Sequence, residues 1–218
     1  KKKILRKKII NKIVYALTQG KGYYVVKNYF NKNKIRKALV IITKILNKDG
    51  NLKKNKYNFS KDKKLCQKWV ANLLNLDPVF VELIQPKLAM DAFKILLGEK
   101  FICGFFEANC MMPGARGQKP HIDYPYNYMY QPGEKIPFDV GKNFLFNCQT
   151  LISLHDMNKD NGATAFLESS YKLKKFPKEN AVKKNKFKQI TMPSGSLVIF
   201  NGLTWHTSLP NYSYNRNR

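Results

Sequence analysis

Acidic residues are scarce in this sequence: its 218 residues include 14 Asp and Glu against 40 Lys and Arg, which gives a formal net charge of +26. A basic excess of this size is typical of proteins that bind polyanions. Its distribution argues otherwise, because residues 1–64 hold 21 basic and 2 acidic residues and are rich in lysine, asparagine and isoleucine. Such a segment favours a solvated basic face, and the sequence lacks recognition-helix, zinc-finger and RNP-like motifs. We therefore expect no nucleic-acid partner.

Long apolar runs are also missing, since none reaches the roughly 18 residues that span a bilayer, so we expect no membrane partner. Residues 1–14 start with basic residues, but Lys12 interrupts the apolar stretch and no small-residue cleavage site follows, which predicts a helix instead of a signal peptide. The cysteines are few, show no CxxC spacing and are predicted to be reduced thiols of a cytoplasmic protein. They are Cys66, Cys103, Cys110 and Cys148.

The first hundred residues are predicted to form a helical layer with one early strand. Within Gly20–Phe30, the run GYYVV is typical of a strand, and Asn31 is expected to cap a helix. The apolar residues of that helix recur at helical spacing: Ile35, Leu39, Ile42 and Leu46. A polar loop is expected over Lys48–Asn58.

Further helix signals follow in the same half. Ser60 is a plausible N-cap for a helix through Leu74, and Asp77-Pro78 has the form of another helix start. Pro86 breaks or restarts that helix, and Gly98 ends it.

From residue 101 onward, turn residues separate short apolar runs, which indicates antiparallel β structure. The expected strands are Phe101–Cys110, Phe144–Leu154, Ala163–Leu167, Phe187–Thr191 and Ser196–Phe200. Many short strands without intervening helices favour a sandwich or jelly roll braced by the front helices. We expect a mainly β fold with N-terminal helices, in the α+β class, as one domain over residues 1–218. Its helical layer would cover 1–100 and its β core 101–218.

The chain has three histidines, His121, His155 and His206. His121 and Asp123 form an HxD pair, whose side chains point the same way at strand spacing. His206 follows the run SLVIF after a short turn, so two strand ends lying together would bring two imidazoles and one carboxylate to one ion. That is the ligand set of a non-heme Fe(II) oxygenase, which leaves positions open for co-substrate and oxygen. The alternative interpretation of the HxD pair is a loop histidine beside a solvated acid. The third histidine, His155, is expected to pack at a strand end or to hydrogen-bond in its turn.

Several stretches, in chain order, resemble the phytanoyl-CoA dioxygenase family of Fe(II)- and 2-oxoglutarate-dependent oxygenases. They are GYYVVKNYF, DPVFVELI, KILLG, NCMMPGARGQKPHIDYPY, LISLHDMNKDNGATAFLESSYK, PSGSLVIFNGLTWH and PNYS. The resemblance runs from about Gly22 to the end and implies a double-stranded β-helix, the cupin-like jelly roll. It also implies that His121, Asp123 and His206 are the catalytic iron ligands. Because Asp123 stands where halogenating variants leave room for halide, the resemblance favours hydroxylation.

Two departures from the family pattern stand out. Where the family commonly has Pro-Gly-Ser-His, residues 168–171 read Glu-Ser-Ser-Tyr. The family's arginine for the distal carboxylate of 2-oxoglutarate is expected six residues after Asn211, which is Asn217, and Arg216 and Arg218 flank that position. Either guanidinium could hold the carboxylate in a bidentate pair, and the strand period does not choose between them. Solvated arginines at a frayed terminus are the alternative. Because the chain lacks an initial Met and stops at Arg218, we expect a fragment truncated at its C-terminus.

Two more residues are candidates for contact with the co-substrate. Gln149, on an apolar strand, either reaches 2-oxoglutarate or is a structurally bonded amide, and Ser213 is expected to hold a turn together with Asn211. After the ligand pair, tyrosines alternate with other residues in what is a substrate-facing loop in the family, or else a lid packed on itself. They are Tyr124, Tyr126, Tyr128 and Tyr130.

The sequence therefore predicts an Fe(II)- and 2-oxoglutarate-dependent dioxygenase. It would hydroxylate a small molecule with molecular oxygen and convert 2-oxoglutarate to succinate and carbon dioxide. Two other classes remain open. One is a non-catalytic, cupin-like module that binds nucleic acid through its basic N-terminal face. The other is a non-oxidative enzyme that uses the same triad with zinc or manganese.

Overall fold

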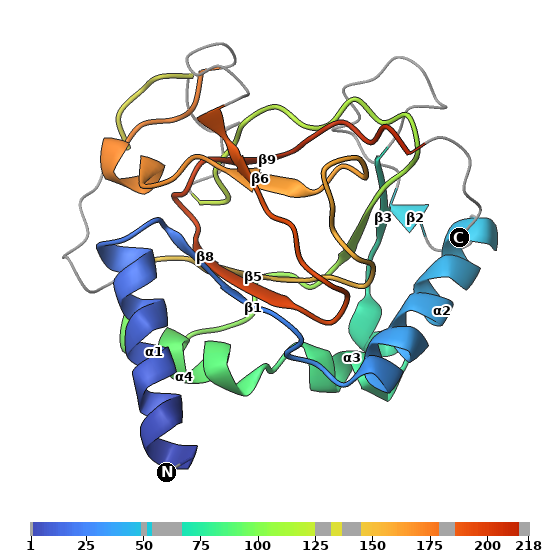
Figure 1. Ribbon diagram of the computed structural model, residues 1–218, viewed down its shortest axis with the longest axis horizontal. Helices are drawn as coiled ribbons and strands as arrows, with labels where there is room; N and C mark the ends of the chain where they lie inside the picture. The colour runs from blue at the N-terminus through green and yellow to red at the C-terminus, as the bar shows by residue number, and fades with distance from the viewer. Residues whose placement is uncertain are drawn as a thin grey trace.

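The regular structure of the first half of the chain is mainly helical, and that of the second half consists of short antiparallel strands (Figure 1). The computed structural model describes residues 2–48, 52–53, 67–124, 132–136, 145–178 and 186–213. The helices are α1 (Lys2–Thr18), α2 (Lys32–Lys48), α3 (Pro78–Leu83) and α4 (Lys87–Leu97), with short 3-10 turns at Leu73–Asn75 and Ser170–Leu173. None of the helices in the described ranges is both long enough and apolar enough to span a membrane.

The helix boundaries follow local chemistry that the sequence already displays. The Asn31 side chain accepts the Asn33 N–H at 2.8 Å at the start of α2. Asp77 caps α3 in the same way through the Val79 N–H at 2.8 Å, with Pro78 in the first helical position. Gly98 ends α4 with a positive φ of 87°. These predicted boundaries are confirmed, as is the helix expected over residues 1–14.

Within the described ranges, the strands form three antiparallel sheets of three strands each, with the orders β1-β8-β5, β7-β6-β9 and β2-β3-β4. Their bounds are β1 Tyr23–Val26, β2 Leu52–Lys53, β3 Gln67–Val70, β4 Ala108–Met111, β5 Cys148–Ile152, β6 Thr164–Phe166, β7 Lys188–Gln189, β8 Leu197–Asn201 and β9 His206–Ser208. Strands β1, β5, β6 and β7 lie inside the ranges expected from the sequence, and β4 and β8 each extend one residue beyond theirs, to Met111 and Asn201. Strand β9 and the two residues of β2 were not expected.

Two predicted elements differ in the structure. The helix expected through Leu74 is wrong for the part described, because Gln67–Val70 form β3, paired with β4 in the register Trp69 to Asn109. The strand expected over residues 101–110 is limited to its end, where β4 pairs with β3. Residues 101–107 are irregular, and Ile102 is 88% exposed. Both differences have one cause: a strand forms where a partner edge is available, and a local pattern does not reveal that partner.

Strand β8 links the helices to the second sheet by the two-residue alternation of its side chains. Leu197 and Ile199 pack with buried residues of α1 and α4. Val198 and Phe200 point the other way and pack with Phe166 of β6. Figure 1 shows the result: α1 and α4 lie along one side of the β1-β8-β5 sheet, and β6 and β9 lie on its other side. The front helices brace an outer sheet face, as the sequence predicts.

Candidate metal centre

Three side chains from two separate segments meet between the facing sheets. His121 and His206 are paired as in an antiparallel ladder, each N–H donating to the other's carbonyl at 3.0 Å. Asp123 joins them because its N–H donates to the Gly202 carbonyl at 2.9 Å. The ring centroids of the histidines are 4.2 Å apart, and His206 Nε2 is 3.5 Å from Asp123 Oδ2. Within the described part of the chain, these three are the one group of His, Cys, Asp or Glu placed to share an ion, with ligand atoms all within 4.8 Å of one another.

Both imidazoles are held in the same tautomer by backbone carbonyls. His121 Nδ1 lies 2.9 Å from the Lys119 carbonyl oxygen, and His206 Nδ1 lies 2.9 Å from that of Thr204. A carbonyl oxygen can only accept, so these partners assign the proton of each ring to Nδ1. The lone pair of each Nε2 is then free to bind a metal ion.

The surroundings of His121 favour its neutral imidazole, the form that binds metals. Loss of hydration lowers the pKa of His121, and the neighbouring His206 lowers it further, against the opposite effects of Asp123 and of the Lys119 carbonyl. His206 is buried against two aromatic rings: its centroid is 5.7 Å from that of Phe166 and 5.1 Å from that of Phe200. Two imidazole nitrogens and one carboxylate therefore face one another. This donor set fits a divalent transition metal such as iron.

The turn between β8 and β9, residues 201–205, is held at both of its ends. The Asn201 amide donates to the Leu17 carbonyl of α1 at 3.0 Å, and its oxygen accepts the Leu203 N–H at 2.9 Å. At the other end the Trp205 N–H donates to Ser170 Oγ at 2.8 Å, and the indole N–H donates to the Lys175 carbonyl at 2.9 Å. Since His206 follows Trp205 directly, these bonds fix the backbone position from which its ring extends.

The Glu-Ser-Ser-Tyr segment connects the site to the N-terminal layer. Tyr23 donates its hydroxyl hydrogen to Glu168 at 3.0 Å, and Lys21 lies 3.2 Å from the same carboxylate. The hydroxyls of Ser169 and Tyr171 both donate to the Gly20 carbonyl, at 3.0 and 3.1 Å. Burial raises the pKa of the Glu168 carboxyl, but the hydrogen bonds from Tyr23 and Lys21 lower it more, so the net shift is downward. The departure from the family pattern thus has a structural use, which is to bind the α1–β1 connection.

The other predicted contacts have mixed outcomes. Gln149 lies on β5 directly opposite Phe200 of β8, so its side chain shares the sheet face that packs against His206. Ser213 and Asn211 do hold a turn: the Asn211 side chain accepts the Ser213 N–H at 3.0 Å and donates to the Met111 carbonyl at 2.7 Å. His155 is exposed in a bend and is not part of the group.

Some predicted residues fall outside the described ranges. These are Arg216, Arg218, Tyr126, Tyr128, Tyr130 and Cys66. Tyr124 is described, and its ring centroid is 6.2 Å from that of Phe146. Cys103, Cys110 and Cys148 are not in disulfide bonds.

Sequence reasoning missed the residues that hold the ligands in place: Asn201, Thr204, Trp205 and the carbonyl of Lys119. Their roles depend on partners more than a hundred positions away or on backbone oxygens, which no residue pattern identifies. Ser170 stands at the serine position of the family's Pro-Gly-Ser-His segment, but its bond to the Trp205 N–H was not expected.

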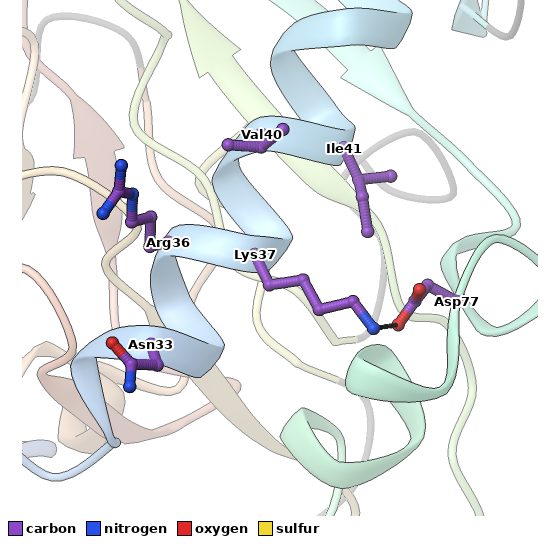
Figure 2. A pocket seen from close by; sticks show the side chains of 6 residues that line it. All are labelled: Asn33, Arg36, Lys37, Val40, Ile41 and Asp77. Atoms are coloured by element: carbon purple, nitrogen blue, oxygen red, sulfur yellow. Dashed lines mark ion pairs between the residues drawn. The ribbon is translucent and has the colours of Figure 1, made fainter.

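A separate hollow of about 470 Å³ lies beside α2, away from the three ligands (Figure 2). Lys37 and Asp77 cross it as an ion pair of 2.8 Å, while Arg36 extends away from that pair. The hydrogen bonds from Lys37 and from the Val79 N–H lower the pKa of Asp77. Since the same carboxylate caps α3, its role there is structural.

Comparison with known proteins places this geometry in context. The family model described as phytanoyl-CoA dioxygenase matches residues 19–218. A curated relative, the dioxygenase af480 of Aspergillus fumigatus, is 25% identical over 149 residues, which are 68% of this chain. The chain spans less than half of that relative, 45% of its length.

Two solved structures share the fold. One is HygX from Streptomyces hygroscopicus with nickel and 2-oxoglutarate bound, with a TM-score of 0.69 and 12% identity over 94% of this chain and 82% of HygX. The other is the epimerase SnoN in complex with Fe3+, alpha ketoglutarate and nogalamycin RO, with a TM-score of 0.65 and 10% identity over 96% of this chain and 80% of SnoN.

Proposed function

The chain belongs to the phytanoyl-CoA dioxygenase family, and from this premise we propose that it is an Fe(II)- and 2-oxoglutarate-dependent oxygenase that hydroxylates a small molecule. Oxygen and 2-oxoglutarate are its co-substrates, and succinate and carbon dioxide are the by-products. One observation carries the proposal: the side chains of His121, Asp123 and His206 converge within 4.8 Å, with both Nδ1 atoms engaged by carbonyls. Bound iron would supply the activation of oxygen, and the protein would supply the positions.

The ligands divide the work at this centre. His121 and His206 would each offer a neutral Nε2, and Asp123 would offer the one carboxylate, so that a divalent ion keeps part of its positive charge for an anionic co-substrate. Phe166 and Phe200 exclude water from one side of His206. In this way they protect the hydrogen bond that sets the tautomer of its ring.

The co-substrate would lie on the sheet face shared by Phe200 and Gln149. We assign the Gln149 amide to contact with 2-oxoglutarate and keep Arg216 and Arg218 as the candidates for its distal carboxylate. Ser213 stays a candidate for the same contact, although its hydroxyl already donates to the Asn211 side chain.

We further propose that the two facing sheets, β1-β8-β5 and β7-β6-β9, belong to a double-stranded β-helix. The edge-to-face contact of Phe166 with Phe200, 5.1 Å between ring centroids, supports this assignment, and so does the likeness to the HygX fold. The metal centre would then lie between the two sheets, at the end where β8 turns into β9.

The test is metal-specific turnover of 2-oxoglutarate by the purified chain. With Fe(II) we expect oxygen uptake and succinate formation in equal amounts, slow without substrate and faster with it, and neither with zinc. An activity supported by zinc without oxygen uptake would instead identify a non-oxidative metal enzyme. A chain that binds no metal but binds nucleic acid with steep salt dependence would be a binding module.

Substrate identification uses the same assay. A panel of small molecules is screened for faster succinate formation, and the product is analysed for one added oxygen atom. A product that gains no oxygen although succinate is formed would contradict hydroxylation and leave the oxygenase class intact.

A further inference from the structure

Thr204 connects a metal ligand to the N-terminal layer of the fold. It lies two residues before His206 in the β8–β9 turn and is 0% exposed. Its hydroxyl donates to the Gly22 carbonyl at 3.1 Å, and its N–H donates to the Asn201 carbonyl at 2.8 Å. Its own carbonyl oxygen is the atom that lies 2.9 Å from His206 Nδ1. All three polar groups of Thr204 are therefore engaged, and one of them holds the imidazole.

The partner position, Gly22, is built for this contact. Its φ is +93°, and a Cβ placed there would lie 2.4 Å from the Thr204 hydroxyl oxygen, so glycine is what allows the two chains to approach. The Gly22 carbonyl also accepts the Asn201 N–H at 2.9 Å. Both ends of the segment Asn201–Thr204 are thus fixed to one backbone oxygen just before β1. A buried carbonyl oxygen that accepts two hydrogen bonds fixes the position of the turn.

We propose that Thr204 is a positioning residue of the metal centre, an inference that rests on the proposed function. Its hydroxyl fixes the orientation of its own peptide unit, and that peptide carbonyl holds the Nδ1–H of His206 and so directs Nε2 toward the ion. The fixed histidine would then bind metal more tightly than one that is free to rotate. Gly22 is not one of the three ligands, yet it would contribute to metal affinity through Thr204.

The test uses two substitutions that separate shape from hydrogen bonding. Thr204→Val keeps the branched shape and removes the hydroxyl, while Thr204→Ser keeps the hydroxyl. We expect Thr204→Val to weaken Co(II) binding by about 10-fold, the lower end of the loss seen when outer groups that orient a metal ligand are mutated. Thr204→Ser should restore most of that affinity. If the valine variant does not fold, Thr204→Ala removes the same hydroxyl without adding a methyl group beside Gly22.

The measurements avoid turnover. Co(II) affinity is titrated by visible absorption on the full chain without 2-oxoglutarate, and the tautomer of His206 is read from its ring nitrogen-15 shifts. In Thr204→Val the Nδ1–H form of His206 should lose population, whereas His121 should keep its own. A purely structural role for Thr204 would leave both tautomers unchanged.

Ser153→Ala is the matched control for lost stability. Ser153 is 3% exposed and donates its hydroxyl hydrogen to the Pro193 carbonyl at 2.9 Å, at the opposite end of β8 from the metal centre. This variant should lower the unfolding midpoint while keeping wild-type Co(II) affinity in the folded protein.

The outcomes separate the two proposals. A wild-type chain that binds no Co(II) overturns the proposed function and this inference together. Wild-type binding with equal affinity in Thr204→Val overturns the inference alone. The inference is also overturned if Ser153→Ala loses Co(II) affinity as strongly as Thr204→Val does.

Discussion

Two regions of the molecule differ sharply in charge and burial. One is the segment that contains β8 and β9, and the other is helix α1. Residues 197–208 contain no Lys, Arg, Asp or Glu, and all but Leu203 are buried. Helix α1 contains six basic residues and no acidic one, and four of its lysines are exposed: Lys3, Lys7, Lys8 and Lys12. The first segment carries a metal ligand and the hydrogen bonds that hold it, while the second keeps its charges in water.

The difference follows from the hydration of charged and polar groups. Charged side chains keep their hydration when they stay at the surface, so lysines can accumulate on α1 at little energetic penalty. Inside the fold, each polar group must find a partner. Asn201, Thr204 and His206 all have one. The charges of α1 are therefore separate from the segment that carries the proposed ligand His206.

The largest expected effect comes from removing an imidazole ligand. His121→Ala and His206→Ala should abolish tight Co(II) binding and 2-oxoglutarate turnover, because a carboxylate and one imidazole are left. Circular dichroism should still show a folded chain. The control is His155→Ala, which removes the exposed third histidine and should bind Co(II) as the wild type does. Normal turnover in both ligand variants would contradict the triad.

The next effect is expected at Asp123. Asp123→Ala keeps both imidazoles and the backbone bond to Gly202, so some Co(II) affinity should remain. Hydroxylation coupled to 2-oxoglutarate should be lost, since the anionic ligand is missing. Product analysis by mass spectrometry checks this expectation. Hydroxylation at the wild-type rate would mean that Asp123 is not a ligand.

A third contrast compares an apolar residue packed against the β8–β9 segment with one on α1. Phe166 is 0% exposed and packs against Phe200 and His206, so Phe166→Ala should reduce the free energy of unfolding by about 3–5 kcal/mol. Ile4 on α1 is 64% exposed, and Ile4→Ala should change the free energy of unfolding by less than about 0.5 kcal/mol. Denaturant unfolding measures both values. A large loss at Ile4 would show that the start of α1 is covered in solution.

The smallest effect is expected from the α1 lysines. Replacing Lys3, Lys7, Lys8 and Lys12 together by Gln removes like-charge repulsion at i, i+4 spacing, which changes the free energy of unfolding by roughly 0.5 kcal/mol or less per pair. Co(II) affinity should stay at the wild-type value. Thermal unfolding and the Co(II) titration check the two statements. A weaker Co(II) affinity in this variant would show that the lysines of α1 influence the metal centre.

Much of the local structure could be predicted from the sequence, because its signals act within one turn of the chain. Asn31, Asp77 and Gly98 mark helix ends by hydrogen bonds or backbone angles that involve near neighbours. The three candidate ligands were also identified, since metal-binding side chains are rare in a chain with three histidines and the HxD spacing is short.

The tertiary structure alone decided what brings these parts together. His121 pairs with His206 across 85 positions of sequence, and Thr204 meets Gly22 across 182 positions. The same dependence on distant partners made Gln67–Val70 a strand and left residues 101–107 irregular. Periodicity and caps report the energy of a residue with its near neighbours, whereas strand pairing and the orientation of a ligand depend on which distant backbone groups become adjacent when the core closes.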